Sequence, residues 1–181
     1  ATPSALEPRP GDIILGDANA KTTVVEYMSL SCTHCAHFHQ ATLPDIEKEF
    51  ITPGKVKFIL RHFPLNEPAI KGAQLVECAG QNNQDRKNFV KVLLEMQTKW
   101  AADQNFLSNL KQIASVGGID SATFDSCMND KALETKILAS RKEGEEVLKV
   151  DSTPYFFING VKYEGERDVA GFRKALTAAQ K

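Results

Sequence analysis

The sequence lacks long apolar runs, clusters of basic residues and internal repeats, and it holds only four cysteines. No stretch approaches the roughly 18 consecutive apolar residues that form a membrane-spanning helix, so none is predicted. Lys and Arg are scattered along the chain and the formal net charge is −1, which argues against nucleic acid or an anionic membrane as a partner. A chain of 181 residues, 42% of them hydrophobic, can form one domain that carries an inserted subdomain.

The N-terminal segment is rich in proline and begins without Met. Pro3, Pro8 and Pro10 predict an extended arm over residues 1–9. Such a start is typical of a mature protein whose signal peptide or anchor has been removed, and a fragment chosen for expression would look the same.

The four cysteines form two pairs of different character. Cys32 and Cys35 belong to a Cys-x-x-Cys motif, whereas Cys78 and Cys127 lie far apart in the chain. An even number of cysteines, with one pair outside the motif, predicts a structural disulfide between Cys78 and Cys127 and an oxidising compartment. The alternative is that these two are buried thiols, which pack as small apolar side chains.

The Cys-x-x-Cys motif lies where a predicted strand at 22–29 gives way to a predicted helix at 32–50. The free N–H groups and dipole at a helix N-terminus favour a thiolate, and a second thiol one turn later can resolve a mixed disulfide. We therefore predict thiol–disulfide exchange, with Cys32 as the nucleophile and Cys35 as the buried resolving thiol. A structural disulfide or half of a zinc site is the alternative for this pair.

Hydrophobic periodicity places strands at both ends of the sequence and helices in the middle. The predicted strands are 12–15, 22–29, 55–63, 154–158 and 161–163, and the predicted helices are 32–50, 69–82, 85–99, 103–116, 121–128, 131–149 and 168–179. Pro44 predicts a kink in the first helix, and Asn159-Gly160 predicts a tight hairpin. The pattern indicates an α/β fold whose sheet, from residues 10–66 and 150–181, is interrupted by a helical domain at 67–149.

Four sequence elements together resemble the DsbA-like family, whose members have a thioredoxin fold with an inserted helical domain. The matching elements are Glu26 six residues before Cys32, Ser31-Cys32-Thr33-His34-Cys35, Phe63-Pro64-Leu65, and Asp151-Ser-Thr-Pro-Tyr-Phe-Phe-Ile-Asn-Gly160. The resemblance covers residues 10–179. It implies a cis peptide bond before Pro154, a periplasmic or cell-envelope location, and oxidation of exported proteins.

Three residues near the dithiol are candidates for tuning it. His34 can donate a hydrogen bond or a positive charge to the Cys32 thiolate, which would make the disulfide a stronger oxidant. The dipeptide Thr33-His34 replaces the Pro-His of the best-known family members and leaves the redox potential open. Glu26 lies in an apolar strand, where burial favours its protonated form, so it could exchange a proton with Cys35. Alternatively, Glu26 faces solvent or pairs with a lysine.

Thr153 and Pro154 are the candidate peptide-binding residues. A cis Pro154 would remove one backbone N–H and present the backbone of Thr153 to an incoming peptide. Without the resemblance, an ordinary trans proline at the start of an edge strand is the default. His37 and His39 follow Cys35, and His39 at i+4 could ligate a metal, although surface or packing positions are the more usual reading.

The leading hypothesis is an enzyme that introduces disulfides into exported proteins by exchange through Cys32–Cys35, as a monomer without metal or organic cofactor. By resemblance, its substrates are unfolded or folding exported proteins with free cysteines. The resemblance also implies reoxidation by a quinone-linked membrane protein of the DsbB type. The rival hypotheses are a reductase or isomerase of the same fold, whose relatives also place Thr before the cis proline, and a cell-envelope metal-binding protein that uses Cys32, Cys35 and His39.

Overall fold

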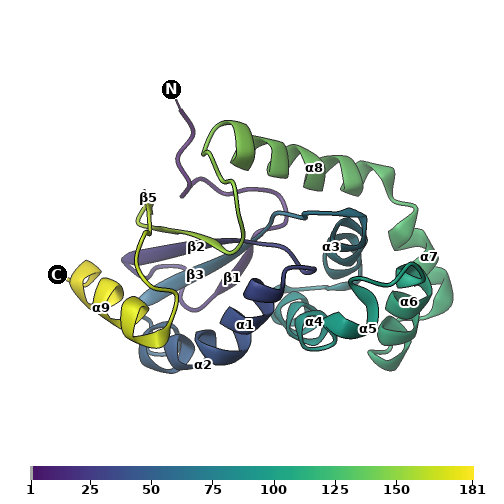
Figure 1. The fold of residues 1–181 in the computed structure, drawn as a ribbon, viewed down its shortest axis with the longest axis horizontal. Coiled ribbons are helices and arrows are strands. Elements are labelled where there is room, and N and C mark those ends of the chain that lie inside the picture. The colour runs from purple at the N-terminus through teal and green to yellow at the C-terminus, as the bar shows by residue number, and fades with distance from the viewer. Residues whose placement is uncertain (1) are drawn as a thin grey trace.

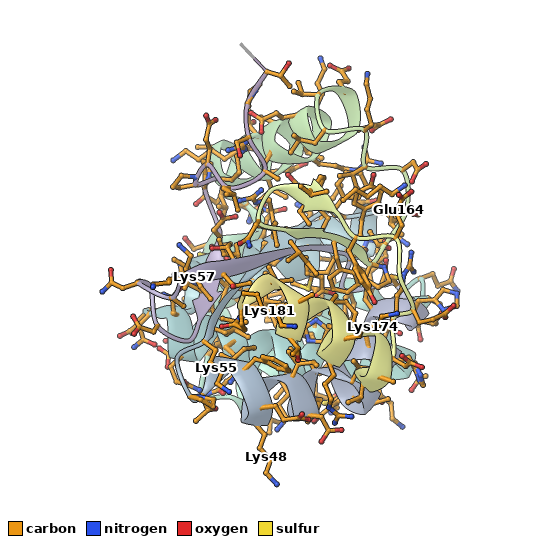
Figure 2. All side chains as sticks on the ribbon, turned by 90° about the vertical axis from the view of Figure 1, so that its left-hand side faces the viewer. Lys48, Lys55, Lys57, Glu164, Lys174 and Lys181 are labelled. Carbon is orange, nitrogen blue, oxygen red and sulfur yellow. A yellow bond between two sulfur atoms is a disulfide. The ribbon has the colours of Figure 1, made fainter. Side chains whose placement is uncertain are left out.

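The computed structural model describes residues 2–181, which build a mixed five-stranded sheet with helices on both faces (Figures 1 and 2). The strands are β1 (Ile13–Leu15), β2 (Thr22–Met28), β3 (Val56–His62), β4 (Tyr155–Ile158) and β5 (Val161–Lys162), in the spatial order β1-β3-β2-β4-β5. β2 and β3 are parallel, and the other neighbours are antiparallel. Residue 1 of the predicted N-terminal arm lies outside the described residues.

β2 is the central strand and carries the site at its C-terminal end. All seven of its residues are buried, because β3 and β4 pair with its two edges and apolar clusters cover its two faces. Val24 and Met28 belong to the larger cluster, which includes side chains of the helices below the sheet in Figure 1, whereas Val25 and Tyr27 point into a smaller cluster on the opposite face. The nearly continuous apolar sequence of β2 is typical of a strand that is covered on both faces.

The helices are α1 (Thr33–Ala41), α2 (Leu43–Ile46), the π-helical turn η1 (Glu47–Ile51), α3 (Glu67–Ala79), α4 (Asn83–Glu95), α5 (Gln97–Trp100), α6 (Phe106–Val116), α7 (Ser121–Met128), α8 (Lys131–Glu146) and α9 (Val169–Ala179). The first predicted helix breaks at Thr42, where φ is −117°, and Pro44 lies in the first turn of α2. Proline lacks the N–H that a continuous helix needs at this position, so the predicted kink is confirmed.

The predicted helix at 85–99 is divided into two, which corrects the sequence-based expectation. Met96 has φ −97° and ψ 15°, outside the helical region, and separates α4 from α5. The change of direction brings Trp100 into the core, where its side chain is fully buried and its indole N–H donates to the carbonyl of Leu93 at 3.0 Å. Burial of this large side chain outweighs the local preference for a continuous helix.

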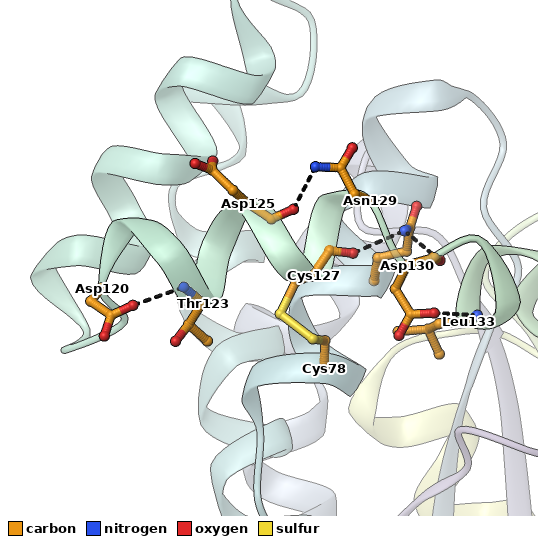
Figure 3. The surroundings of a disulfide bond; sticks show 9 residues. Cys78, Asp120, Thr123, Asp125, Cys127, Asn129, Asp130 and Leu133 are labelled. Carbon is orange, nitrogen blue, oxygen red and sulfur yellow. Dashed lines mark hydrogen bonds between the residues drawn. A yellow bond between two sulfur atoms is a disulfide. The ribbon is translucent and has the colours of Figure 1, made fainter.

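The helices from α3 to α8 lie between β3 and β4 in the chain; α3 to α7 lie to the right of the sheet in Figure 1, and α8 runs along the top of the molecule back toward the sheet. A disulfide between Cys78 and Cys127 joins α3 to α7, with 5.5 Å between the Cα atoms (Figure 3). Asp120 and Asp130 cap α7 and α8 by accepting hydrogen bonds from the backbone N–H groups three residues ahead. Within residues 2–181, no helix combines the length and apolar character needed to cross a membrane.

The N-terminal arm is attached to the sheet by a buried guanidinium. Arg61 of β3 donates hydrogen bonds to the carboxylate of Asp12, to the carbonyls of Ala5 and Glu7, and to the hydroxyl of Tyr27. Residues 5–7 form a turn rather than a fully extended segment. The arm therefore covers the sheet face opposite to the one that carries Glu26.

Candidate active site

Cys32 lies at the N-terminus of α1, directly after the turn that follows β2. The backbone N–H of Cys32 donates to the carbonyl of Ser29 at 3.1 Å, which closes the turn. Cys32 is the N-cap residue, with φ −85° and ψ 121°, and is partly exposed. The backbone N–H groups in the first turn of a helix have no partners within the helix, so they are available to the Cys32 sulfur.

The surroundings of Cys32 strongly favour its thiolate. The pKa of Cys32 is lowered from its ordinary value of 9.0 to about 5, chiefly because the thiol of Cys35 donates a hydrogen bond to its sulfur. The backbone N–H groups of Cys35 and His34 act in the same direction, and partial burial opposes them without cancelling them. At neutral pH, Cys32 is therefore a thiolate when the motif is reduced.

Cys35 is held in the opposite protonation state. Its side chain is fully buried on the inner face of α1. Burial raises the pKa of Cys35, and the hydrogen bond to Cys32 and the negative charge of Glu26 raise it further. The reduced motif thus pairs an accessible thiolate with a buried, protonated thiol, which are the states that attack and resolution require.

Glu26 is buried beneath the dithiol and is paired with a histidine. Its carboxylate Oε1 lies 2.8 Å from Nε2 of His39, while Oε2 has no hydrogen-bond partner among residues 2–181. The alternative expectations for Glu26, exposure to solvent or pairing with a lysine, are therefore wrong. Of the alternatives for His39, the structure shows the packing position beside the site: its side chain is only 9% exposed and it is the partner of Glu26.

The dithiol also contacts the loop that carries Thr153 and Pro154, which is distant in the sequence. The carbonyl oxygen of Thr153 lies 3.5 Å from the Cys32 sulfur, and the Thr153–Pro154 peptide bond is cis. Both Thr153 and Pro154 are buried. The structure therefore brings together the Cys-x-x-Cys motif and the Thr-Pro dipeptide, which the sequence places 121 residues apart.

The other predicted site residues are exposed. Thr33 and His34 lie on the surface of the first turn of α1, and His37 is exposed one turn later. In this structure, His34 acts on Cys32 through its backbone N–H. Among residues 2–181, no cluster of three or more His, Cys, Asp or Glu side chains is arranged to hold a metal ion.

Sequence reasoning missed one polar residue that contacts the motif. Gln97, from α5, donates from Nε2 to the carbonyls of Leu30 at 2.8 Å and of Cys32 at 2.9 Å. No local pattern marks this residue, because it lies 65 residues from Cys32. The only signal for His39 was its i+4 spacing from Cys35, which places both side chains on one face of α1.

A dithiol at the N-terminus of the helix that follows the central strand, facing a Thr-Pro loop, defines a thioredoxin-fold thiol–disulfide site. Residues 9–178 match the family model described as thioredoxin. The crystal structure of α-DsbA1 from Wolbachia pipientis superposes with a TM-score of 0.89 at 32% identity, over 97% of this chain and 94% of that one. The chain belongs to the thioredoxin family and, within it, to the DsbA-like thiol–disulfide oxidoreductases. The predicted fold class is thereby confirmed.

Two further comparisons bear on this placement, the first on the family and the second on the fold alone. A protein of Rickettsia prowazekii named as a protein-disulfide oxidoreductase is 31% identical over 153 residues, which are 84% of this chain and 56% of that protein. The chain thus spans about half the length of the curated relatives it matches. A protein-disulfide isomerase from Novosphingobium aromaticivorans shares the fold with a TM-score of 0.87 at 22% identity, over 96% of this chain and 100% of that one.

Proposed function

We propose that the protein introduces disulfides into exported proteins, using the Cys32–Cys35 disulfide as the oxidant. The observation that carries this proposal is the position of Cys32 at the N-cap of α1, where the thiol of Cys35 and the backbone N–H groups of His34 and Cys35 lower its pKa to about 5. A stabilised thiolate stabilises the reduced form of the motif, so the corresponding disulfide accepts electrons more readily. The thiolate is also a good leaving group, which speeds its release from a mixed disulfide.

The reaction proceeds in two exchanges. A substrate thiolate attacks the Cys32 sulfur, the Cys32–Cys35 bond breaks, and its electron pair goes to Cys35, which takes up a proton. A second substrate thiolate then attacks the substrate sulfur of the mixed disulfide and displaces Cys32 as a thiolate. The substrate loses two electrons and two protons as its disulfide forms, the enzyme gains both electrons and one proton, and one proton is released.

Glu26 is the proposed proton donor and acceptor for Cys35. It is close enough for its charge to raise the pKa of Cys35, and its Oε2 has no hydrogen-bond partner among the described residues. His39 anchors the other carboxylate oxygen at 2.8 Å, so the carboxyl group is held in a fixed orientation. This arrangement supports proton transfer to and from a thiol that is itself shielded from solvent.

The Thr153–Pro154 loop is the proposed contact for the substrate backbone. Its position beside the Cys32 sulfur would align an extended peptide next to the thiolate by strand-like pairing. Thr33 and His34 are exposed beside the same sulfur and would meet the substrate from the other side.

We further propose a location in the periplasm or cell envelope and action as a monomer. The disulfide between Cys78 and Cys127 supports an oxidising compartment, because such bonds are rare where thiols are kept reduced. Folding exported proteins with free cysteines are the proposed substrates. After each cycle, a quinone-linked membrane protein would take two electrons from the dithiol and restore the disulfide.

The reduction potential of Cys32–Cys35 tests the direction of electron flow. The protein is equilibrated in glutathione buffers, the thiols are trapped, and the modified cysteines are counted by mass. A potential at or above about −180 mV is expected of an oxidant, whereas a potential near about −270 mV would place the protein among thioredoxin-like reductants and overturn the proposal. A Cys78→Ala, Cys127→Ala variant measured in parallel ensures that only the active-site pair is counted.

A further inference from the structure

Gln97 binds the turn that presents the nucleophile. Its side-chain NH₂ group donates to two carbonyls, those of Leu30 and Cys32, at 2.8 and 2.9 Å, and so spans the residue between them. The Cys32 carbonyl also accepts the first hydrogen bond of α1, from Ala36 N–H at 3.1 Å. Both lone pairs of this carbonyl are therefore used, one by the helix and one by Gln97.

The short helix that carries Gln97 is anchored by buried side chains at both of its ends. Gln97 is 8% exposed and begins α5, immediately after the break at Met96. Three residues later, the fully buried Trp100 packs beside Leu30 and Gly72 of α3, where an added Cβ on the glycine would lie 3.1 Å from both side chains. The short helix that carries Gln97 thus packs between α3 and the active-site turn at residues 30–32.

We infer that Gln97 is a positioning residue through which the helical segment sets the redox properties of Cys32. By holding the carbonyls on either side of Ser31, Gln97 fixes the N-terminus of α1. The N–H groups of His34 and Cys35 then point at the Cys32 sulfur. The inference rests on Cys32 being the nucleophile of the proposed function, but not on the direction of electron flow.

The chain offers a matched control for this role. Gln74 of α3 is also buried and also donates from Nε2 to two carbonyls, those of Cys127 at 3.1 Å and Asp130 at 3.4 Å. Those carbonyls lie beside the Cys78–Cys127 disulfide rather than the dithiol. Replacement of either glutamine removes two hydrogen bonds of the same kind, but only Gln97 touches the active-site turn.

The experiment compares Gln97→Leu and Gln74→Leu in the full chain. The readouts are the Cys32 pKa, from thiolate absorbance near 240 nm as a function of pH, the reduction potential in glutathione buffers, and the melting temperature. We expect Gln97→Leu to raise the Cys32 pKa by about one unit, a tenfold loss of thiolate stabilisation. The exchange equilibrium with glutathione should shift tenfold, which makes the potential about 30 mV more negative. Gln74→Leu should lower the melting temperature and leave both active-site readouts unchanged.

An unchanged Cys32 pKa and potential in Gln97→Leu would overturn the inference, whatever happens to stability, because Gln97 would then act only in folding. If Gln97→Leu does not fold, Gln97→Met removes the same donors with an unbranched side chain and is judged by the same readouts. The potential of the unsubstituted protein tests the proposed oxidase direction separately. A reducing potential would overturn that proposal, and the difference between the variants would still decide the role of Gln97.

Discussion

The lowered pKa of Cys32 makes the stability of the reduced protein depend on pH in a way that the oxidised protein cannot share. Reduction converts the Cys32–Cys35 disulfide into a thiolate and a buried thiol, and only the folded protein stabilises that thiolate. We therefore expect the reduced form to gain stability relative to the oxidised form as the pH rises from 4 to 7.

The size of this gain in stability follows from the change in the Cys32 pKa on folding. The pKa of Cys32 falls from 9.0 in an ordinary environment to about 5 in the fold. For a group whose pKa is lowered by folding, the stabilisation is complete above the unfolded value and is lost as the pH falls through the folded value. At pH 7 the solution is two units above the folded pKa, which corresponds to about 2.7 kcal/mol at 1.36 kcal/mol per unit, and at pH 4 almost nothing remains. Because Cys32 is partly exposed, solvent screening should reduce the gain to about 1–2 kcal/mol.

Urea unfolding of the dithiol and disulfide forms at pH 4 and pH 7 measures this gain. The difference between the two forms at each pH cancels the titration of the carboxylates and histidines that they share. A Cys32→Ser variant, kept reduced, provides the second control, because its stability should lack the extra rise between pH 4 and pH 7. If the difference between reduced and oxidised protein were the same at both pH values, the assignment of Cys32 as the stabilised thiolate would be wrong.

Two further predictions concern the Cys78–Cys127 disulfide and the pair formed by Glu26 and His39. Replacing Cys78 and Cys127 together by alanine opens a loop of 49 residues and should lower the free energy of unfolding by up to about 4 kcal/mol, as measured in urea. Exchange activity should persist, and its complete loss would mean that the cysteine pairs are misassigned. His39→Leu leaves the buried Glu26 without its partner and should cost about 1–3 kcal/mol of stability, whereas the exposed His37→Leu should cost less than about 0.5 kcal/mol. Equal effects of the two histidine variants in urea unfolding would contradict the role of the His39–Glu26 pair.

Much of the fold could be predicted because its signals are local. The six apolar and β-branched residues of β2 and the Asn159-Gly160 hairpin each specify their own conformation. Asn159 and Gly160 adopt φ values of 50° and 84°, which is the left-handed pair that a tight hairpin requires. The division between α4 and α5 could not be predicted in this way. Met96 is a good helix former, and the break there depends on the burial of Trp100 against segments distant in the chain.

The candidate site likewise combines features that are local in the sequence with contacts between distant segments. The Cys-x-x-Cys motif and its position after a strand are local features, and the family resemblance added the Thr153-Pro154 dipeptide. The pairing of Glu26 with His39 joins a strand to a helix, and the contact of Gln97 with Cys32 joins segments 65 residues apart. Such contacts depend on how the elements pack, which no pattern within one element records.

The different pKa values of the two thiols show how local sequence features and long-range contacts act together. Spacing alone places one cysteine at the N-cap of α1 and the other on its inner face, so the helix geometry decides which sulfur is accessible and which is buried. Long-range contacts then act on each thiol, through the carbonyls held by Gln97, the Thr153 loop and the charge of Glu26. A substitution in α1 that preserves the motif would therefore keep the order of the two pKa values. Substitutions at these distant positions should change the separation between the two values, and with it the reduction potential of the dithiol.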